Sequence, residues 1–143
     1  MRIVVMDAQG GGMGRMLVEQ LKRALPEQRI IAVGTNAMAT AAMMRAGADQ
    51  GATGENAIRV TAARADVILG PMGLVLCDAM LGEITAGMAC AVGASPAQKI
   101  LVPMSRCQVT VAGAARLTMA EAVAAAVQES VALARREAAG EGE

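Results

Sequence analysis

The chain of 143 residues has the length of one ordinary domain, and its 13 basic and 13 acidic residues cancel, which argues against a general nucleic-acid binder with a basic surface. It contains no His, Phe, Trp or Tyr, which excludes aromatic stacking of bases and any mechanism that relies on a His or Tyr side chain. Three cysteines without zinc or disulfide spacing, and no apolar run long enough for a bilayer, predict a cytoplasmic protein without a metal site or membrane segment.

The first half of the chain alternates between short apolar runs and segments with helical spacing of apolar residues. Runs of β-branched and apolar side chains predict strands buried on both faces, and the segments between them predict helices that end at Pro or Gly. In chain order these are a strand at 2–6, a helix at 13–25, a strand at 29–34 and a helix at 36–47. Asn36 and Gly47 are the expected N-cap and C-terminal stop of the second helix.

The second half continues this alternation. Residues 54–64 fit either a helix or a short strand with a turn, and we favour the helix. The later elements are a strand at 65–70, one or two short apolar helices within 72–93, a strand at 99–104, an edge strand at 108–113 and a helix at 118–137. The last helix opens with a capping box formed by Thr118 and Glu121.

This order of elements predicts one α/β domain over residues 1–137, a Rossmann-like three-layer sandwich with a mostly parallel sheet, followed by a frayed polar tail at 138–143. Ligands of such sheets bind beyond the carboxyl ends of the strands. Small, hydroxylated and amide residues follow the predicted strands, as a phosphate or ribose site requires. The predicted cofactor-binding residues are Asp7, Gly10, Gly11, Gly12, Met13, Gly14, Gly34, Thr35, Asn36, Glu55, Asn56, Gly70, Pro71, Ser105 and Arg106.

The glycine-rich turn "GGGMG" at residues 10–14 carries the strongest signal. Backbone N–H groups at a helix N-terminus bind phosphate when no Cβ covers them, which glycine ensures; the alternative is a corner that only packs strand against helix. Arg15 stands where a GxGxxG motif would have its third glycine. The turn is similar to the looser one of short-chain dehydrogenases over about the first 25 residues, with Ala8 at the place of the first glycine. Those enzymes use a Tyr and a Lys, so the lack of Tyr excludes their mechanism.

The turn predicts a bound nucleotide or dinucleotide, with NAD or NADP as the cofactor. If the protein is catalytic, an oxidoreductase is the expected class, because the cofactor carries the chemistry that these side chains lack. Residues 34–36 (GTN) offer neither the carboxylate of an NAD site nor the arginine of an NADP site. Two alternatives remain open: a nucleotide-binding or sensing module without turnover, and a structural homo-oligomeric assembly protein whose glycines serve packing alone.

Several side chains near the strand ends have two interpretations each. Asp7 either contacts a ribose or metal, or caps the N–H groups of its own turn. Glu55 and Asn56 either hold a ligand hydroxyl or begin a helix, where the dipole favours an acid. Arg106 either clamps a phosphate or forms a surface ion pair. Cys107, beside Arg106, is either a reactive thiolate or a half-buried hydrophobe, and we favour the latter.

The apolar middle of the chain raises the same question. Asp78 and Glu83 are either functional carboxylates or face water at a helix edge, which we favour. Core positions are expected for Cys77 and Cys90. For the methionines at 38, 43, 44, 80 and 88 we favour the core or a subunit interface over a ligand site. The run "VILGPMGLVLCDAML" is too apolar for an exposed helix and predicts a homodimer.

Six blocks of sequence together resemble a known family. They are "DAQGGGMG", "GTNAMATAAMMRAGA", "GATGENAI", "GPMGLV", "MLGEIT" and "SRC". The family that they resemble is an uncharacterised bacterial domain of unknown function, family 3842, and the likeness runs from Met1 to about Gly113. Ala8 departs from the Gly of that family's first turn. The resemblance implies a shared pocket and no particular chemistry.

Overall fold

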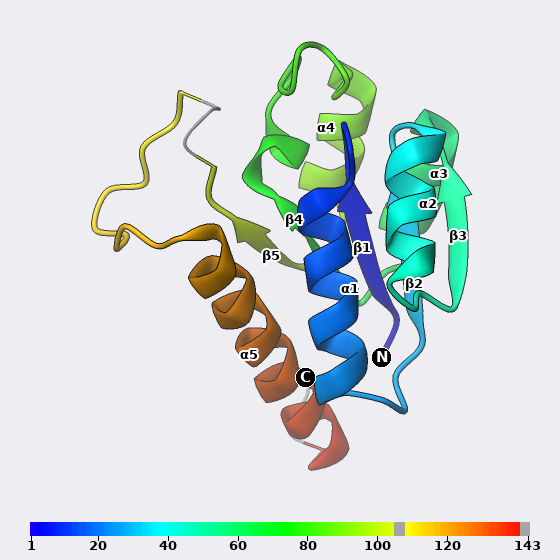
Figure 1. Ribbon diagram of the computed structural model, residues 1–143, viewed down its shortest axis with the longest axis vertical. Coiled ribbons are helices and arrows are strands. Elements are labelled where there is room, and N and C mark those ends of the chain that lie inside the picture. Colours follow the sequence, from blue (N-terminus) through cyan, green and yellow to red (C-terminus); the bar gives the residue numbers. More distant parts are fainter. Residues whose placement is uncertain (105–107, 141–143) are drawn as a thin grey trace.

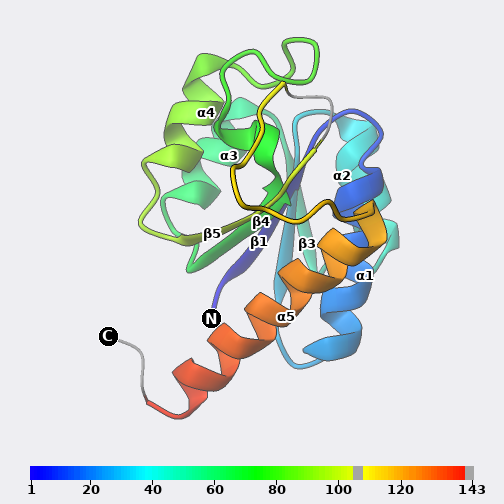
Figure 2. The same ribbon diagram turned by 90° about the vertical axis from the view of Figure 1, so that its left-hand side faces the viewer.

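The computed structural model describes residues 1–104 and 108–140 and shows a parallel sheet between two layers of helices (Figures 1 and 2). The order of the described strands is β3-β2-β1-β4-β5, and every neighbouring pair is parallel. Their bounds are β1 (Ile3–Asp7), β2 (Ile30–Gly34), β3 (Gln50–Thr53), β4 (Val67–Pro71) and β5 (Gln98–Val102). The predicted Rossmann-like three-layer sandwich is confirmed, and the sheet is wholly rather than mostly parallel.

Helices cover both faces of this sheet (Figure 2). The first layer contains α1 (Gly12–Ala24), α2 (Ala37–Arg45) and α5 (Met119–Ala138). The second layer contains α3 (Glu55–Ala62), the short 3-10 helix η1 (Met72–Val75) and α4 (Ala86–Gly93). Each helix after a strand therefore begins at the carboxyl edge of the sheet, which is the upper edge in Figure 1.

The alternation of side chains along β1 fixes the direction of Asp7. Ile3 and Val5 pack into the layer of α1 and α5, whereas Val4 and Met6 pack into the layer of α3 and α4. Successive side chains of a strand point to opposite faces, so Asp7 belongs with Ile3 and Val5. Its carboxylate therefore faces the N-terminus of α1.

The predicted helix ends are confirmed by their caps. The Asn36 side chain accepts a hydrogen bond from the N–H of Ala39 and caps α2, and Gly47 follows that helix with φ 113°. Thr118 and Glu121 form both bonds of the capping box at the start of α5. These short-range motifs depend on local sequence alone, so sequence patterns identify them well.

One strand was not predicted from the sequence, and one expected strand is absent. β3 is an edge strand of polar and small residues, Gln50–Thr53, which has no apolar run to reveal it and pairs with β2 through its backbone. Residues 108–113 form no strand: this exposed segment lies outside the sheet, although Val109 and Val111 alternate with polar neighbours. Alternation alone does not make a strand when no neighbouring backbone is present to pair with it.

The apolar run at 67–81 is buried within one chain over most of its first half, up to Leu74. Its first five residues form the buried strand β4, and Gly73 and Leu74 of η1 are buried after it. Two short helices within 72–93 are confirmed as η1 and α4, and the chain between them has no helix, with positive φ values of 62°, 55° and 57° at Asp78, Met80 and Leu81. Burial accounts for the first half of the run, whereas Leu81 is 98% exposed, and the homodimer stays a prediction.

The core positions expected for Cys77 and Cys90 are wrong, because both thiols are exposed. Cys77 lies in the loop after η1, and Cys90 lies on the solvent side of α4. Of the five methionines assigned to core or interface, Met43 and Met88 are buried, whereas Met38 and Met44 are exposed. Among the helices of the described residues, none has the length and hydrophobicity needed to span a bilayer.

Candidate functional site

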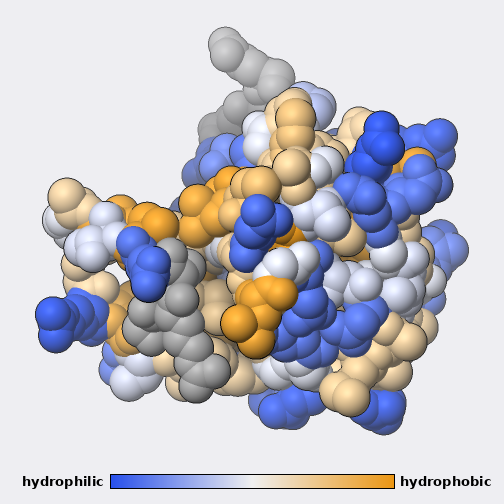
Figure 3. Space-filling view, turned by 90° about the horizontal axis from the view of Figure 1, so that it is seen from above, coloured by the Kyte–Doolittle hydropathy of each residue, from blue (hydrophilic) through white to orange (hydrophobic). Residues whose placement is uncertain are grey.

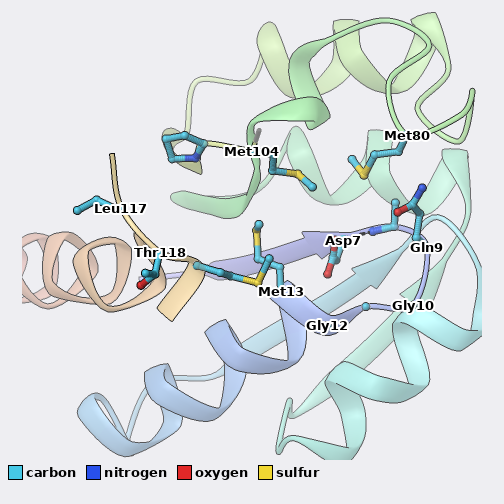
Figure 4. Close-up of a pocket in the computed structure, with 13 residues that line it drawn as sticks. Asp7, Gln9, Gly10, Gly12, Met13, Met80, Met104, Leu117 and Thr118 are labelled. Carbon is cyan, nitrogen blue, oxygen red and sulfur yellow. Dashed lines mark hydrogen bonds between the residues drawn. The ribbon is translucent and has the colours of Figure 1, made fainter. Parts of the chain in front are cut away.

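A cavity of about 470 Å³ opens at the carboxyl edge of the sheet, between the N-termini of α1 and α5 (Figure 4). Seen from above, this edge presents hydrophobic residues interspersed with hydrophilic ones (Figure 3). The described residues that line the cavity are Asp7, Ala8, Gln9, Gly10, Gly11, Gly12, Met13, Met80, Pro103, Met104, Leu117, Thr118 and Met119. Backbone atoms of the β1–α1 turn thus face an apolar wall rich in methionine.

Two glycines of the turn face open space. A Cβ added at Gly10 or Gly12 would meet nothing within 4 Å, and neither glycine has a positive φ. Both line the cavity and are exposed. Their missing side chains therefore leave the backbone accessible to a ligand, as the phosphate interpretation of the turn requires.

The other two glycines serve packing. Gly11 is the N-cap of α1 with φ 72°, and a Cβ there would lie 2.8 Å from Cα of Ala39. A Cβ at Gly14 would lie 2.5 Å from Sδ of Met43. The phosphate-binding interpretation of the turn thus fits Gly10 and Gly12, whereas the packing interpretation fits Gly11 and Gly14. The positive φ of 52° next to them belongs to Gln9 and not to Ala8, so Ala8 places no strain on the turn.

The first turn of α1 has unused donors. Within the part of the chain that the structure describes, the N–H groups of Gly12 and Met13 have no acceptor, whereas the N–H of Gly14 donates to Asp7 at 2.6 Å. Such groups at the start of a helix carry roughly half a positive charge. An anion in the cavity would be within reach of donors that the protein itself leaves unpaired.

Asp7 is buried beneath this turn and accepts hydrogen bonds from its backbone. Its side chain is only 5% exposed and accepts hydrogen bonds from the N–H of Ala8 at 2.8 Å and of Gly14 at 2.6 Å. Burial raises the pKa of Asp7 above its ordinary value; the two hydrogen bonds oppose this, and the charge of Glu83 adds to it. The capping interpretation of Asp7 is confirmed, and contact with a ribose or metal stays a prediction.

A pH titration of stability tests the raised pKa of Asp7. The folded protein holds this proton more tightly than the unfolded chain, so the stabilising contribution is complete below about pH 4 and is lost as the pH rises through the folded-state pKa. We expect Asp7→Asn to remove this decline in the free energy of unfolding, measured with urea between about pH 4 and 8. Parallel profiles for the variant and the wild-type protein would refute the shift.

Glu83, one of the two carboxylates with an open interpretation, holds the loops beside the cavity although it does not line the cavity itself. Its carboxylate accepts hydrogen bonds from the N–H of Gln9 at 3.0 and 3.1 Å, the Thr35 hydroxyl at 2.9 Å and the Asn36 amide at 2.8 Å. Burial raises the pKa of Glu83, but these three donors together leave the pKa below its ordinary value. The expectation that Glu83 faces water is wrong, whereas Asp78 is exposed as expected.

The bonds of Glu83 join three loops. Gln9 follows β1, Thr35 and Asn36 follow β2, and Glu83 itself comes from the loop before α4. The amide of Asn36 also donates to the carbonyl oxygen of Gln9 at 3.0 Å. Side chains from distant segments therefore hold both backbone polar groups of Gln9, the residue with positive φ that leads into the glycine turn. No short-range signal could identify this partner, because 48 positions separate Thr35 from Glu83.

At the carboxyl end of β2, the predicted ligand-binding residues Gly34, Thr35 and Asn36 already bond to other residues of the protein. A Cβ at Gly34 would lie 2.5 Å from the Thr40 hydroxyl, which accepts the Gly34 N–H at 3.1 Å. Thr35 and Asn36 are engaged with Glu83. None of these three predicted residues lines the cavity among the residues described there. The carboxylate that the sequence lacks at this strand end is supplied by Glu83.

The remaining predicted residues lie elsewhere. Glu55 begins α3 and accepts a hydrogen bond from Thr85, while Asn56 lines a separate hollow between α3 and α4. Gly70 and Pro71 are buried in β4. Ser105 and Arg106, like Cys107, lie outside the described residues. Within residues 1–104 and 108–140, no group of three or more Asp, Glu or Cys side chains is placed to hold a metal ion.

The apolar wall and the start of α5 were also missing from the predicted site. One signal was present: a helix that follows a parallel strand must begin at the carboxyl edge, so the capping box at Thr118 already placed its N-terminus beside the glycine turn. Met80, Met104 and Met119 carry no such signal, because methionine is as common in cores as in binding sites.

Comparison with known proteins identifies a family but no activity. A family model described as "Domain of unknown function (DUF3842)" matches residues 2–135. No curated protein matches the chain, and no solved structure does either. The match covers nearly all of the sequence and includes every described element of the sheet. The chain therefore belongs to the DUF3842 family of domains of unknown function.

Proposed function

We propose that the protein binds a nucleotide or dinucleotide of the NAD or NADP type, with a phosphate group at the turn formed by Gly10, Gly11, Gly12 and Met13. One observation carries the proposal: the unpaired N–H groups of Gly12 and Met13 open onto a cavity, and no side chain of Gly10 or Gly12 covers them. This is the arrangement by which helix N-termini hold phosphate groups in parallel α/β sheets.

The start of α5 supports the same ligand. Thr118 and Met119 line the cavity opposite the glycine turn, and the N–H of Met119 has no acceptor among the described residues. Two helix N-termini therefore face one cavity, each with roughly half a positive charge. Together they favour a negatively charged group between them.

The apolar wall suits the uncharged part of a nucleotide. Met13, Met80, Met104 and Met119 line the cavity with Leu117 and Pro103. Thioether side chains are flexible and polarisable, so they adapt to a flat ring without the aromatic residues that this chain lacks. The volume of about 470 Å³ lies within the range of roughly 300–1,000 Å³ for small-molecule sites.

Glu83 favours NAD over NADP, although it does not line the cavity: a ribose would reach it past Gln9, which lines the cavity and donates a hydrogen bond to Glu83. It brings a carboxylate to the end of β2, where NAD-binding sheets have an acidic group for the ribose 2′-hydroxyl. Its Oε2 atom accepts only the N–H of Gln9 among the described residues, so acceptor capacity remains. A 2′-phosphate at the same place would be repelled by the negative charge.

A binding or sensing module without turnover is the second candidate. Among the described residues that line the cavity, Asp7 is the one with a titratable side chain, and both of its oxygens already accept backbone N–H groups. Such a site offers little for proton transfer. If the protein does turn over a substrate, a bound NAD supplies the hydride chemistry, and an oxidoreductase is the class that we propose.

Thermal-shift and calorimetric titrations with NAD(H), NADP(H), ATP, GTP and flavins test the proposal. We expect one of these ligands to bind and, at about 100 times its Kd, to stabilise the fold by about 2.7 kcal/mol. A turnover assay with that ligand then separates an oxidoreductase from a binding module. If none of these ligands stabilises or binds the protein, the glycines serve packing alone and the assembly role takes the place of our proposal.

A further inference from the structure

The charges around the cavity restrict the kind of phosphate that it can hold. Asp7 is the one charged side chain among the described residues that line it. Sites that hold a terminal phosphate commonly add Arg or Lys side chains to the backbone donors. Here the described wall opposite the donors is apolar instead.

Asp7 shares the helix N-terminus with the ligand. It takes the N–H of Gly14, while the preceding N–H groups of Gly12 and Met13 remain for an anion. Consecutive N–H groups in a first helical turn point in nearly the same direction. A phosphate on Gly12 and Met13 therefore lies directly beside the Asp7 carboxylate, at a place where little water separates the two charges.

Among the described residues, the neighbouring charged groups do not offset this repulsion. Arg116, next to the lining residue Leu117, is exposed, so water screens its charge. Glu83 acts on Asp7 from the loop before α4 and is negative as well. On α5 the nearest acid is Glu121, which is held in the capping box, and on α1 Arg15 is paired with Glu19 at 3.8 Å. The attraction available from the described elements is that of two helix N-termini, about one charge in total.

We propose that Asp7 makes the site selective for a phosphate group with a single negative charge, such as each phosphate of the diphosphate bridge of a dinucleotide, over a doubly charged terminal phosphate monoester. The inference rests on the proposed function and names the chemical class of its ligand. A dinucleotide bridge satisfies the two free donors with one charged oxygen per phosphate. A terminal phosphate brings a second charge against Asp7.

A matched pair of ligands isolates this second charge. Adenosine 5′-monophosphate and its methyl ester differ mainly in the second ionisation of the phosphate, which has a pKa near 6. We expect equal affinities within about threefold at pH 5, where both phosphates carry one charge, and a preference of about tenfold for the ester at pH 8. The ratio of the two Kd values is measured by calorimetry, with the corresponding guanosine pair in parallel.

Two variants assign the preference to Asp7. Asp7→Asn removes the charge and keeps one acceptor oxygen for the turn, so the ratio at pH 8 is expected to fall to within about threefold. Asp66→Asn makes the same change at an exposed carboxylate that pairs with Arg2. Asp66 directly precedes β4, at the edge of the sheet away from the cavity, so this control is expected to leave the ratio unchanged. Should Asp7→Asn fail to fold, the proposal is tested in the wild-type protein by how the ratio of the two Kd values changes between pH 5 and 8.

The outcomes separate this inference from the proposed function. If neither the adenosine nor the guanosine pair binds although a nucleotide of the thermal-shift series does, the inference is refuted and the proposed function stands; if no nucleotide of either series binds, both are refuted. If a pair binds with equal affinities at pH 8, or the monoester binds more tightly, the selectivity is refuted while nucleotide binding stands. An unchanged ratio in Asp7→Asn refutes the role of Asp7.

Discussion

Gly12→Val is expected to weaken nucleotide binding about 100-fold while the protein keeps its fold. A valine side chain at this position has room, because a Cβ would meet nothing within 4 Å and φ is not positive. It would cover the N–H groups of Gly12 and Met13 and displace the phosphate from both. Hydrogen bonds to a charged group contribute about 1.5–3 kcal/mol each, so the loss of both, at the lower limit of about 3 kcal/mol, gives a reduction of about 100-fold.

Gly93→Val is the matched control. Gly93 also lies in a helix, is exposed, and has nothing within 4 Å of its Cβ position, but it belongs to α4 and does not line the cavity. We expect wild-type affinity in this variant and melting temperatures within a few degrees for both proteins, read by calorimetry and circular dichroism. Undiminished binding in Gly12→Val would show that the phosphate does not lie on this turn.

Gly70→Ala is expected to lower the free energy of unfolding by about 3 kcal/mol, the upper part of the range for overpacked cores. Gly70 lies in β4, beside β1, and a Cβ there would collide with the carbonyl oxygen of Met6 and lie 2.5 Å from Cδ1 of Leu74. The carbonyl belongs to a neighbouring strand and cannot move away without disturbing the sheet. The prediction gives Gly70 a packing role, although its place at the end of a predicted strand suggested ligand contact.

Urea unfolding checks this prediction against Gly10→Ala. At Gly10 a Cβ has open space, so the same added methyl group is expected to change stability by no more than about 0.5 kcal/mol. Equal stabilities for the two variants would mean that β1 and β4 separate at this point without cost, which contradicts the close approach of their backbones.

The fold was predictable where its determinants are local. Buried parallel strands such as β1 and β4 require unbroken apolar runs, and helix ends require caps, so the sequence shows both directly. β3 needs neither, because an edge strand of polar residues pairs through its backbone alone. Val109 and Val111 show the converse: an alternating pattern has no effect when the fold places no partner strand beside it.

The site was predictable to the extent that it consists of backbone. The glycine turn can be recognised from the sequence, because backbone N–H groups that are accessible to a ligand require residues without a Cβ. Which glycines face the cavity depends on Ala39 and Met43 of α2, and no sequence pattern contains those contacts. The bonds of Glu83 to Gln9 and Thr35 arise in the same way, since the topology brings three loops to one edge of the sheet.

The most direct test of phosphate binding at the turn is a nitrogen–proton NMR titration with whichever nucleotide stabilises the protein most in the thermal-shift series. We predict that the amide signals of Gly10, Gly12 and Met13 move most, that Met119 at the start of α5 follows, and that Gly93 stays in place. Shifts confined to other surfaces, such as the hollow between α3 and α4, or no shift with any nucleotide, would contradict a phosphate site at the N-terminus of α1.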